Sequence, residues 1–445
     1  MIKSTLEAIR TAEPALRRRM AAGAIWSIAG AGIASGCTML ANIISARVLG
    51  AAPFGEMAIV LSTTNLFTSL FTAGMGMTAT RYVAEARDSE PERAGAIVGL
   101  SWATSMVVGA AAALLVILFA PVLSRQVLGK ETLAVPLSLG AAAMFFAALN
   151  GSQVGTLSGF ESFRHVATGN LVRGIGIVIL VSAGAIFGGL NGALLGYALA
   201  GAAATIYYQL VVRRECEANG IRISYRFSGD ELRVLSRFTL PVLITTFSFT
   251  PAQWWGNVLL ATHSGYAEAG VFNAVLHWQL FILFFSTAVS NIGLPMLSNI
   301  RAERDPAKYK RCLALTFALT TAPAIVIAIP IAILAPWILH LYGREFVHGS
   351  TALIFISAAS VLTALNIPVG HAIWSLDAIR PAVALALLRG GVLIIAAYAL
   401  ADKAATGLAE AYLIMAAIQT AVSIPFMFWL LKNSFVHEQV EAIAA

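Results

Sequence analysis

The chain has 445 residues, of which 58% are hydrophobic and only 11% are charged, and its mean hydropathy is +0.80. A water-soluble protein of this size carries about a quarter charged residues, so this composition excludes a soluble globular protein. The net charge of +7 does not indicate nucleic-acid binding, because the basic residues gather in one set of loops.

Twelve apolar spans follow one another along the chain, each long enough to cross about 30 Å of hydrocarbon as a helix. The first six cover residues 20–46, 56–80, 94–120, 132–157, 166–187 and 190–212. The second six cover residues 238–261, 269–297, 312–335, 351–375, 381–400 and 407–431. Because lipid offers no hydrogen-bond partners, each span must be helical. The sequence therefore predicts an all-α integral membrane protein of about twelve transmembrane helices.

The basic residues predict how these helices are oriented. Of the 29 Lys and Arg residues, 23 lie in the N-terminal segment, in the even-numbered loops or after the last span. Such an excess places both termini in the cytoplasm. The predicted segments are a cytoplasmic N-terminus at 1–19, a first lobe at 20–212, a basic linker at 213–237, a second lobe at 238–431 and a cytoplasmic tail at 432–445.

The two halves of the chain match each other at polar and glycine positions when one half is shifted by 215 or 216 residues. Asn150 falls on Asn366, Glu161 on Asp377, Arg164 on Arg380, Arg173 on Arg389, Gly50 on Gly265 and Gly55 on Gly270. Since each half holds an even number of spans, the halves are parallel repeats. Two such lobes rocking about a shared site are typical of alternating-access transporters.

Two arginines fall inside apolar spans, where a charge costs several kcal/mol and indicates a function. Arg173 and Arg389 occupy equivalent positions in the repeat, so a pseudo-twofold axis would place them facing each other in a shared cavity. The alternative is that both side chains extend to the cytoplasmic interface. No Asp or Glu is predicted near the middle of the membrane, which favours an anionic substrate such as a phosphate held by Arg.

Other polar side chains in the spans are candidates for the same cavity. Gln253, Trp254, Trp255 and Asn257 supply the aromatic and amide groups that pack against sugar rings, or else they form an interfacial aromatic belt. His277 and His371 are either hydrogen-bonded packing residues or sites of proton coupling.

Catalytic and metal-binding signatures are absent from the sequence. It holds no HExxH, no GxSxG, no Walker A loop and no metal-spaced Cys/His set. The expectation is a protein that is not an enzyme and has no catalytic residues, metal or cofactor, with transport driven by the membrane potential or by H⁺ or Na⁺.

Two stretches of the first half resemble a known family. The residues Arg47, Gly50, Gly55 and Arg81 lie in a stretch similar to the opening signature of oligosaccharide flippases. Residues 159–164, ending at Arg164, and 170–173 resemble their fourth-to-fifth-helix segment. These flippases are polysaccharide exporters of the multidrug/oligosaccharidyl-lipid/polysaccharide (MOP) superfamily, which includes the O-antigen and exopolysaccharide flippases.

The resemblance implies a V-shaped, two-lobed bundle in the bacterial inner membrane. It would carry an undecaprenyl-pyrophosphate-linked oligosaccharide from the cytoplasmic to the periplasmic leaflet. On this hypothesis Arg173 and Arg389 attract the pyrophosphate, and the aromatic and amide residues at 253–257 contact the glycan. The implied partners are the lipid-linked oligosaccharide, membrane lipids and a polysaccharide polymerase or export complex, and no nucleic acid.

Two other functions remain open at this point. A cation-coupled multidrug exporter would share the fold but should place an acidic residue inside a lobe. A membrane glycosyltransferase or polymerase should show a large outer loop or a charged catalytic cluster, whereas the outer loops predicted here are short.

Overall fold

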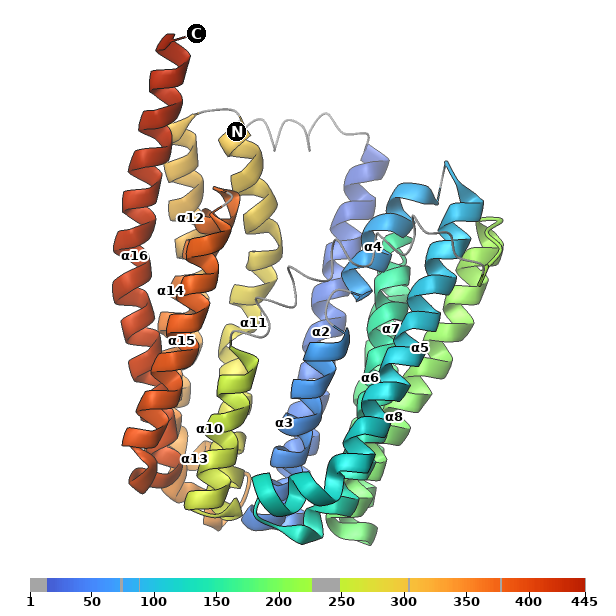
Figure 1. Ribbon diagram of the computed structural model, residues 1–445, viewed down its shortest axis with the longest axis vertical. Helices are drawn as coiled ribbons and strands as arrows, with labels where there is room; N and C mark the ends of the chain where they lie inside the picture. Colours follow the sequence, from blue (N-terminus) through green and yellow to red (C-terminus); the bar gives the residue numbers. More distant parts are fainter. Residues whose placement is uncertain are drawn as a thin grey trace. The chain divides into compact units, whose positions relative to one another are not determined.

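The computed structural model describes residues 14–72, 75–87, 89–225, 249–302, 305–376 and 378–444. Within these ranges all regular structure is helical (Figure 1). The helices up to the middle of the chain are α2 (Pro14–Leu49), α3 (Ala51–Thr72), α4 (Met75–Ala86), α5 (Pro91–Val122), α6 (Ala134–Gly159), α7 (Phe163–Gly176), α8 (Ser182–Ala218) and α10 (Thr250–His263). The later helices are α11 (Tyr266–Ala302), α12 (Pro306–Ile333), α13 (Ala335–His340), α14 (Ser350–Ser375), α15 (Ile379–Ala399) and α16 (Ala404–Ala444). Short π or 3₁₀ turns lie at Leu123–Val127, Glu131–Leu133, Ile177–Val181, Arg344–Gly349 and Ala401–Lys403.

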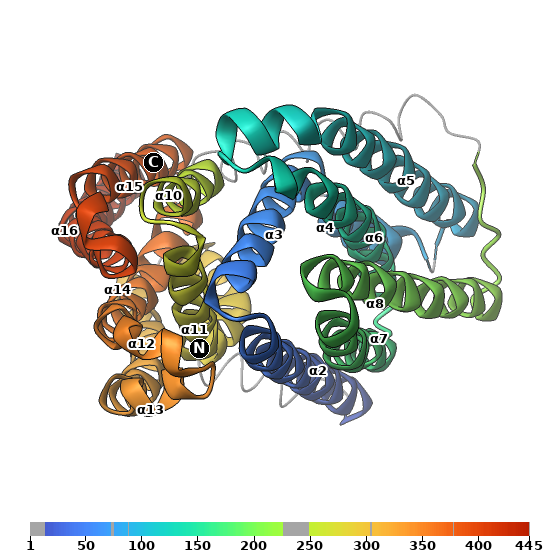
Figure 2. The ribbon, with the colours of Figure 1, turned by 90° about the horizontal axis from the view of Figure 1, so that it is seen from below.

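The helices pack into two compact units, a first unit of Ala15–Gly270 and a second unit that begins at Val271. In the end-on view of Figure 2, α5, α6, α7 and α8 of the first unit lie next to one another, as do α12, α14, α15 and α16 of the second. The first unit includes α10, because this helix packs on α3. The predicted boundaries at 20–212, 213–237 and 238–431 therefore differ from the compact units, and the linker beyond residue 225 lies outside the described residues.

Nine helical runs in the described part of the chain are long and apolar enough to cross a membrane. One of them, Phe163–Ala218, is 56 residues long and reverses direction at Gly189, whose φ is 57° and ψ is −140°. The backbones of Gly184 and Gly192 touch across this hairpin, since a Cβ on Gly184 would lie 2.0 Å from the Gly192 carbonyl oxygen. The run is thus two antiparallel spans, as the sequence predicted.

The predicted fold is confirmed. The chain is an all-α multi-pass membrane protein, and its helices are consistent with about twelve spans. α3 and α10 are the remaining two spans of the predicted set. The predicted seventh span begins at residues outside the described ranges, with α10 as its second part.

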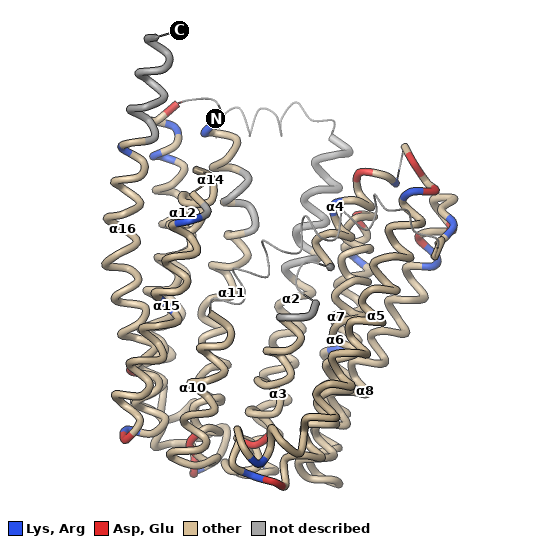
Figure 3. Tube along the Cα trace, in the orientation of Figure 1, with Lys and Arg blue, Asp and Glu red and all other residues tan. Residues whose placement is uncertain are grey.

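Charged residues gather at the helix ends, and the middle of each unit is almost free of them (Figure 3). Among the described helices no Asp or Glu lies more than about two turns from a helix end. Of the acidic residues near the start of a helix, Glu410 of α16 lies farthest from that start. Its carboxylate pairs with Lys403 at 2.8 Å. This distribution is what a hydrocarbon environment imposes.

The helix ends show the internal repeat directly. In the first half the Arg87 Nη1 donates to the Gly159 carbonyl oxygen at 3.0 Å, and in the second half the Arg301 Nη1 donates to the Ser375 carbonyl oxygen at 2.6 Å. Gly159 and Ser375 are 216 residues apart, the offset found in the sequence. Each arginine satisfies a carbonyl that a helix leaves without an internal partner at its C-terminus. The repeat therefore conserves an interaction as well as a sequence pattern.

A side-chain cap lies at the start of α12, in the second half of the chain. Asp305 accepts hydrogen bonds from the backbone N–H groups of Ala307 and Lys308, both at 3.0 Å. The bond from Lys308 lowers the pKa of Asp305 below its ordinary value, because it stabilises the ionised carboxylate. The cap is therefore present above the ordinary pKa of Asp and is lost as the pH falls through the lowered pKa.

Candidate functional site

The amide and aromatic residues predicted at 253–257 lie on α10, in the first unit. The Trp254 Nε1 donates to the Thr63 hydroxyl of α3 at 3.0 Å, and Asn257 is buried, with its amide bonded to the Gln253 carbonyl oxygen at 3.2 Å. The ring centres of Trp254 and Trp255 lie 6.0 Å apart. The four residues differ in burial: Asn257 is buried, Gln253 and Trp254 are half-buried, and Trp255 is exposed.

Arg173 lies on α7 of the first unit and is exposed. It is close enough to interact electrostatically with Tyr197 and Tyr208, both on α8. The Tyr208 hydroxyl donates to the Asn170 side chain at 3.1 Å, one turn before Arg173 on α7. The Arg173 guanidinium therefore lies within electrostatic range of two tyrosines, which are neutral hydrogen-bonding groups.

Arg389 lies on α15 of the second unit and is half-buried. It interacts electrostatically with Tyr412, a buried residue of α16 whose ring packs 5.6 Å from that of Phe272. Both repeat-equivalent arginines thus have a tyrosine from the last helix of their own half as a neighbour. Their predicted position across one cavity remains a prediction, because they lie in different units.

The two predicted histidines both contact groups within the second unit. The His277 Nδ1 is 2.7 Å from the Asn273 carbonyl oxygen, one turn earlier on α11. The His371 Nε2 is 2.9 Å from the Ser290 hydroxyl, and Gly293 leaves room for its ring, since a Cβ there would lie 2.8 Å from Nδ1. These contacts are what the packing interpretation predicts, and a role in proton coupling remains a prediction.

The motif residues lie mostly at helix ends. Gly50, at the junction of α2 and α3, has a φ of 79°, and Gly55 packs against Gly270. Arg81 lies over the ring of Tyr82 at 5.5 Å, and Arg164 lies over the ring of Trp26 at 5.9 Å. Arg47 and Arg380 are exposed.

Asn150 and Asn366 mark the repeat, and Asn366 is also predicted from the sequence either to line the cavity or to bond between helices; in the structure both amides bond between helices. The Thr205 hydroxyl of α8 donates to the Asn150 Oδ1 of α6 at 2.9 Å. In the second unit the Asn366 Nδ2 of α14 donates to the Thr420 hydroxyl of α16 at 2.6 Å, and the Ser423 hydroxyl donates to the Asn366 Oδ1 at 2.6 Å. Each amide joins the fourth and sixth helices of its half. An isolated amide in an apolar helix is a sequence signal for such a bond between helices.

Replacing Asn366 with leucine is expected to lower the free energy of unfolding by about 1–2 kcal/mol, because interhelical hydrogen bonds in membranes contribute about 0.6 to 1.7 kcal/mol each. The measurement is thermal unfolding of the purified protein in detergent. Thr363→Ala is the matched control, since this half-buried hydroxyl bonds only to the Ala359 carbonyl oxygen of its own helix. Equal losses in both variants would contradict the prediction.

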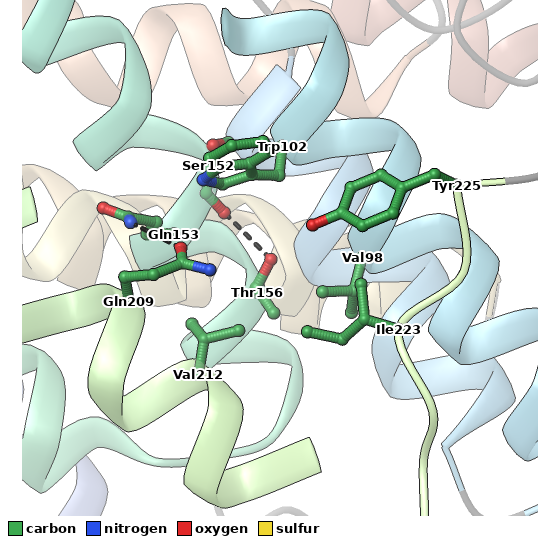
Figure 4. Close-up of a pocket in the computed structure, with 9 residues that line it drawn as sticks. All are labelled: Val98, Trp102, Ser152, Gln153, Thr156, Gln209, Val212, Ile223 and Tyr225. Atoms are coloured by element: carbon green, nitrogen blue, oxygen red, sulfur yellow. Dashed lines mark hydrogen bonds between the residues drawn. The ribbon is translucent and has the colours of Figure 1, made fainter. Parts of the chain in front are cut away.

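A pocket next to the Asn150 cluster was not predicted (Figure 4). It lies between α5, α6 and α8, and residues 221–225 close one side of it. The Gln153 Nε2 donates to the Gln209 Oε1 at 2.9 Å, and the Trp102 and Tyr225 rings meet edge to face at 6.2 Å. The lining includes no charged side chain. Its chemistry suits a neutral hydroxyl donor such as water, so the anion-binding groups must be sought elsewhere.

Comparisons with known proteins connect this geometry to a family. Residues 20–301 match the model of a family described as polysaccharide biosynthesis protein. The chain belongs to this family. It is 26% identical to the lipid III flippases of Escherichia coli (strain K12) and Shigella flexneri over 290 residues, which cover 64% of this chain and 69% of each relative.

Solved structures show the same fold. An inward-facing MATE family multidrug resistance transporter of the MOP superfamily aligns with a TM-score of 0.77 at 16% identity, covering 92% of this chain and 98% of that one. A MOP superfamily transporter from Pyrococcus furiosus aligns with a TM-score of 0.67 at 16% identity, covering 93% of this chain and 94% of that one. The sequence-based assignment is confirmed at the level of the polysaccharide biosynthesis family, and the solved structures show the expected fold.

Proposed function

We propose that the chain is a flippase that moves an undecaprenyl-pyrophosphate-linked oligosaccharide from the cytoplasmic to the periplasmic leaflet of the bacterial inner membrane. The observation that carries this proposal is the match to the polysaccharide biosynthesis family over residues 20–301, together with the similarity to lipid III flippases. The charge distribution supports it, because the described helices hold arginine but no acidic residue deep in the apolar region.

Arg173 and Arg389 would bind the pyrophosphate. Guanidinium groups form short, charge-assisted hydrogen bonds with phosphate oxygens and keep their charge in an apolar setting. Of the residues on α10, Gln253, Trp254 and Trp255 are accessible enough to touch a glycan, whereas Asn257 is buried. Trp254 also bonds α10 to α3 through the Thr63 hydroxyl. Moving an anion outward is favoured by about 2.3 kcal/mol per charge per 100 mV of inside-negative potential, so transport would not require an intramembrane carboxylate.

A deletion strain tests the proposal through leaflet-resolved detection of its lipid-linked oligosaccharide. Without the protein, the oligosaccharide should accumulate on the cytoplasmic face, and the wild-type gene should relieve the accumulation. Growth of the same strain with a panel of cationic drugs is the comparison. Normal surface polysaccharide combined with increased drug sensitivity would contradict the flippase and favour the multidrug exporter, whose fold this chain shares.

A further inference from the structure

A charged and aromatic cluster joins three segments of the first unit, next to the starts of α3 and α11. The Lys130 Nζ, in the turn between α5 and α6, is 2.5 Å from the Glu56 Oε1 of α3. The same ammonium lies 5.3 Å from the ring centre of Tyr266, the first residue of α11. The Tyr266 hydroxyl in turn donates to the Leu128 carbonyl oxygen at 2.7 Å. Lys130 therefore contacts both α3 and α11 at once.

Burial of Glu56 and the backbone of the α5–α6 turn both hold the Glu56–Lys130 pair in place. With Lys130 in place the Glu56 side chain is 11% exposed and Leu128 is buried, so the paired carboxylate has little access to water. The turn that carries Lys130 is fixed by the positive φ of Gly129, at 69°, and by a hydrogen bond from the Lys130 N–H to the Ser124 carbonyl oxygen at 2.8 Å. A carboxylate this poorly hydrated strongly favours keeping its partner, and the aromatic face adds attraction for the same ammonium.

The other charged groups nearby do not replace this contact. Arg125 pairs with Glu131 within the same turn, and both side chains are exposed. Glu268 lies one half-turn beyond Tyr266 on α11 and is half-buried. Lys130 is thus the cation that the structure places on Glu56.

We propose that Glu56, Lys130 and Tyr266 form a latch that holds the start of α11 on α3 and on the α5–α6 turn, and that opens in every transport cycle. Glu56 and Lys130 belong to the first repeat and Tyr266 to the second. Alternating access moves one repeat against the other, so this set of bonds must break when the repeats separate here. The latch does not depend on the identity of the transported molecule.

The test is a distance measurement between spin labels at Gln126→Cys and Ala267→Cys in the full-length protein in lipid nanodiscs. Both positions are exposed, and the three native cysteines (Cys37, Cys216 and Cys312) are replaced by alanine in every sample. Lys130→Gln should increase the population with the longer distance at least about threefold. Tyr266→Phe keeps the ring but loses the hydroxyl, and it should give a smaller increase in the same direction.

The control is Lys403→Gln, which breaks the Lys403–Glu410 pair of the second unit and should leave the distances unchanged. The exchanged pair Glu56→Lys with Lys130→Glu should return the distances toward those of the wild type. Thermal unfolding verifies that each variant is folded. Unchanged distances in a folded Lys130→Gln variant, or equal changes in the Lys403→Gln control, would overturn the latch.

Discussion

Replacing both Arg173 and Arg389 with alanine is expected to abolish relief of the cytoplasmic-face accumulation in the deletion strain. A hydrogen bond to a charged group contributes about 1.5–3 kcal/mol, which corresponds to roughly a 10- to 100-fold loss for each arginine. Each single variant should therefore reduce the transport rate by one to two orders of magnitude. The measurement is the rate at which the oligosaccharide becomes accessible on the periplasmic face.

Matched variants separate this role from a general loss of positive charge. Arg213→Ala at the end of α8 and Arg311→Ala on α12 remove exposed arginines from the same two units and should retain transport. Arg→Lys at 173 and 389 should restore only part of the rate, because lysine keeps the charge but not the two-point geometry. A double alanine variant that is present in the membrane in normal amounts and still transports at the wild-type rate would contradict the arginine site. That result would leave the flippase proposal intact.

The sequence was sufficient for the fold because its strongest signals are physical constraints of the bilayer. Twenty-residue apolar runs must be helices in lipid, and the predicted spans 166–187 and 190–212 agree with the structure even though they form one continuous run through Gly189. The predicted span 56–80 instead covers parts of two helices, α3 and α4. The repeat was also readable, since Gly159 and Ser375 accept equivalent arginine hydrogen bonds at the predicted offset.

The candidate site was less predictable because the sequence does not show which way a side chain points or how deeply it is buried. The run at 253–257 reads as one aromatic and amide cluster, yet in the structure Asn257 is buried, Trp254 is half-buried and bonded to Thr63, and Trp255 is exposed. For the same reason the sequence did not predict the contact between Glu56 and Lys130. Glu56 and Lys130 are 74 residues apart and appear as unrelated span-end charges, and only the packing of α3 with the α5–α6 turn brings them together.

The largest loss of stability is expected from Gly55→Ala, at the place where α3 and α11 touch. A Cβ on Gly55 would lie 1.8 Å from the Tyr266 carbonyl oxygen and 2.7 Å from the Gly270 nitrogen, and a Cβ on Gly270 would lie 2.2 Å from the Ala51 carbonyl oxygen. Both contacts involve backbone, which cannot rotate away, so the helices must separate. Overpacking typically costs about 1–3 kcal/mol, and a clash with backbone should lie at the upper end of that range. The measurement is thermal unfolding in detergent.

Gly36→Ala is the matched control, because nothing lies within 4 Å of the added Cβ in the middle of α2. That substitution should be neutral or stabilise the helix by up to about 1 kcal/mol. Gly55 and Gly270 are repeat-equivalent, as are Ala51 and Tyr266 at the same offset of 215 residues, so the contact is symmetric between the halves. Gly270→Ala should therefore destabilise the protein about as much as Gly55→Ala. A large loss from only one of the two would mean that the pseudo-twofold axis does not pass through this contact.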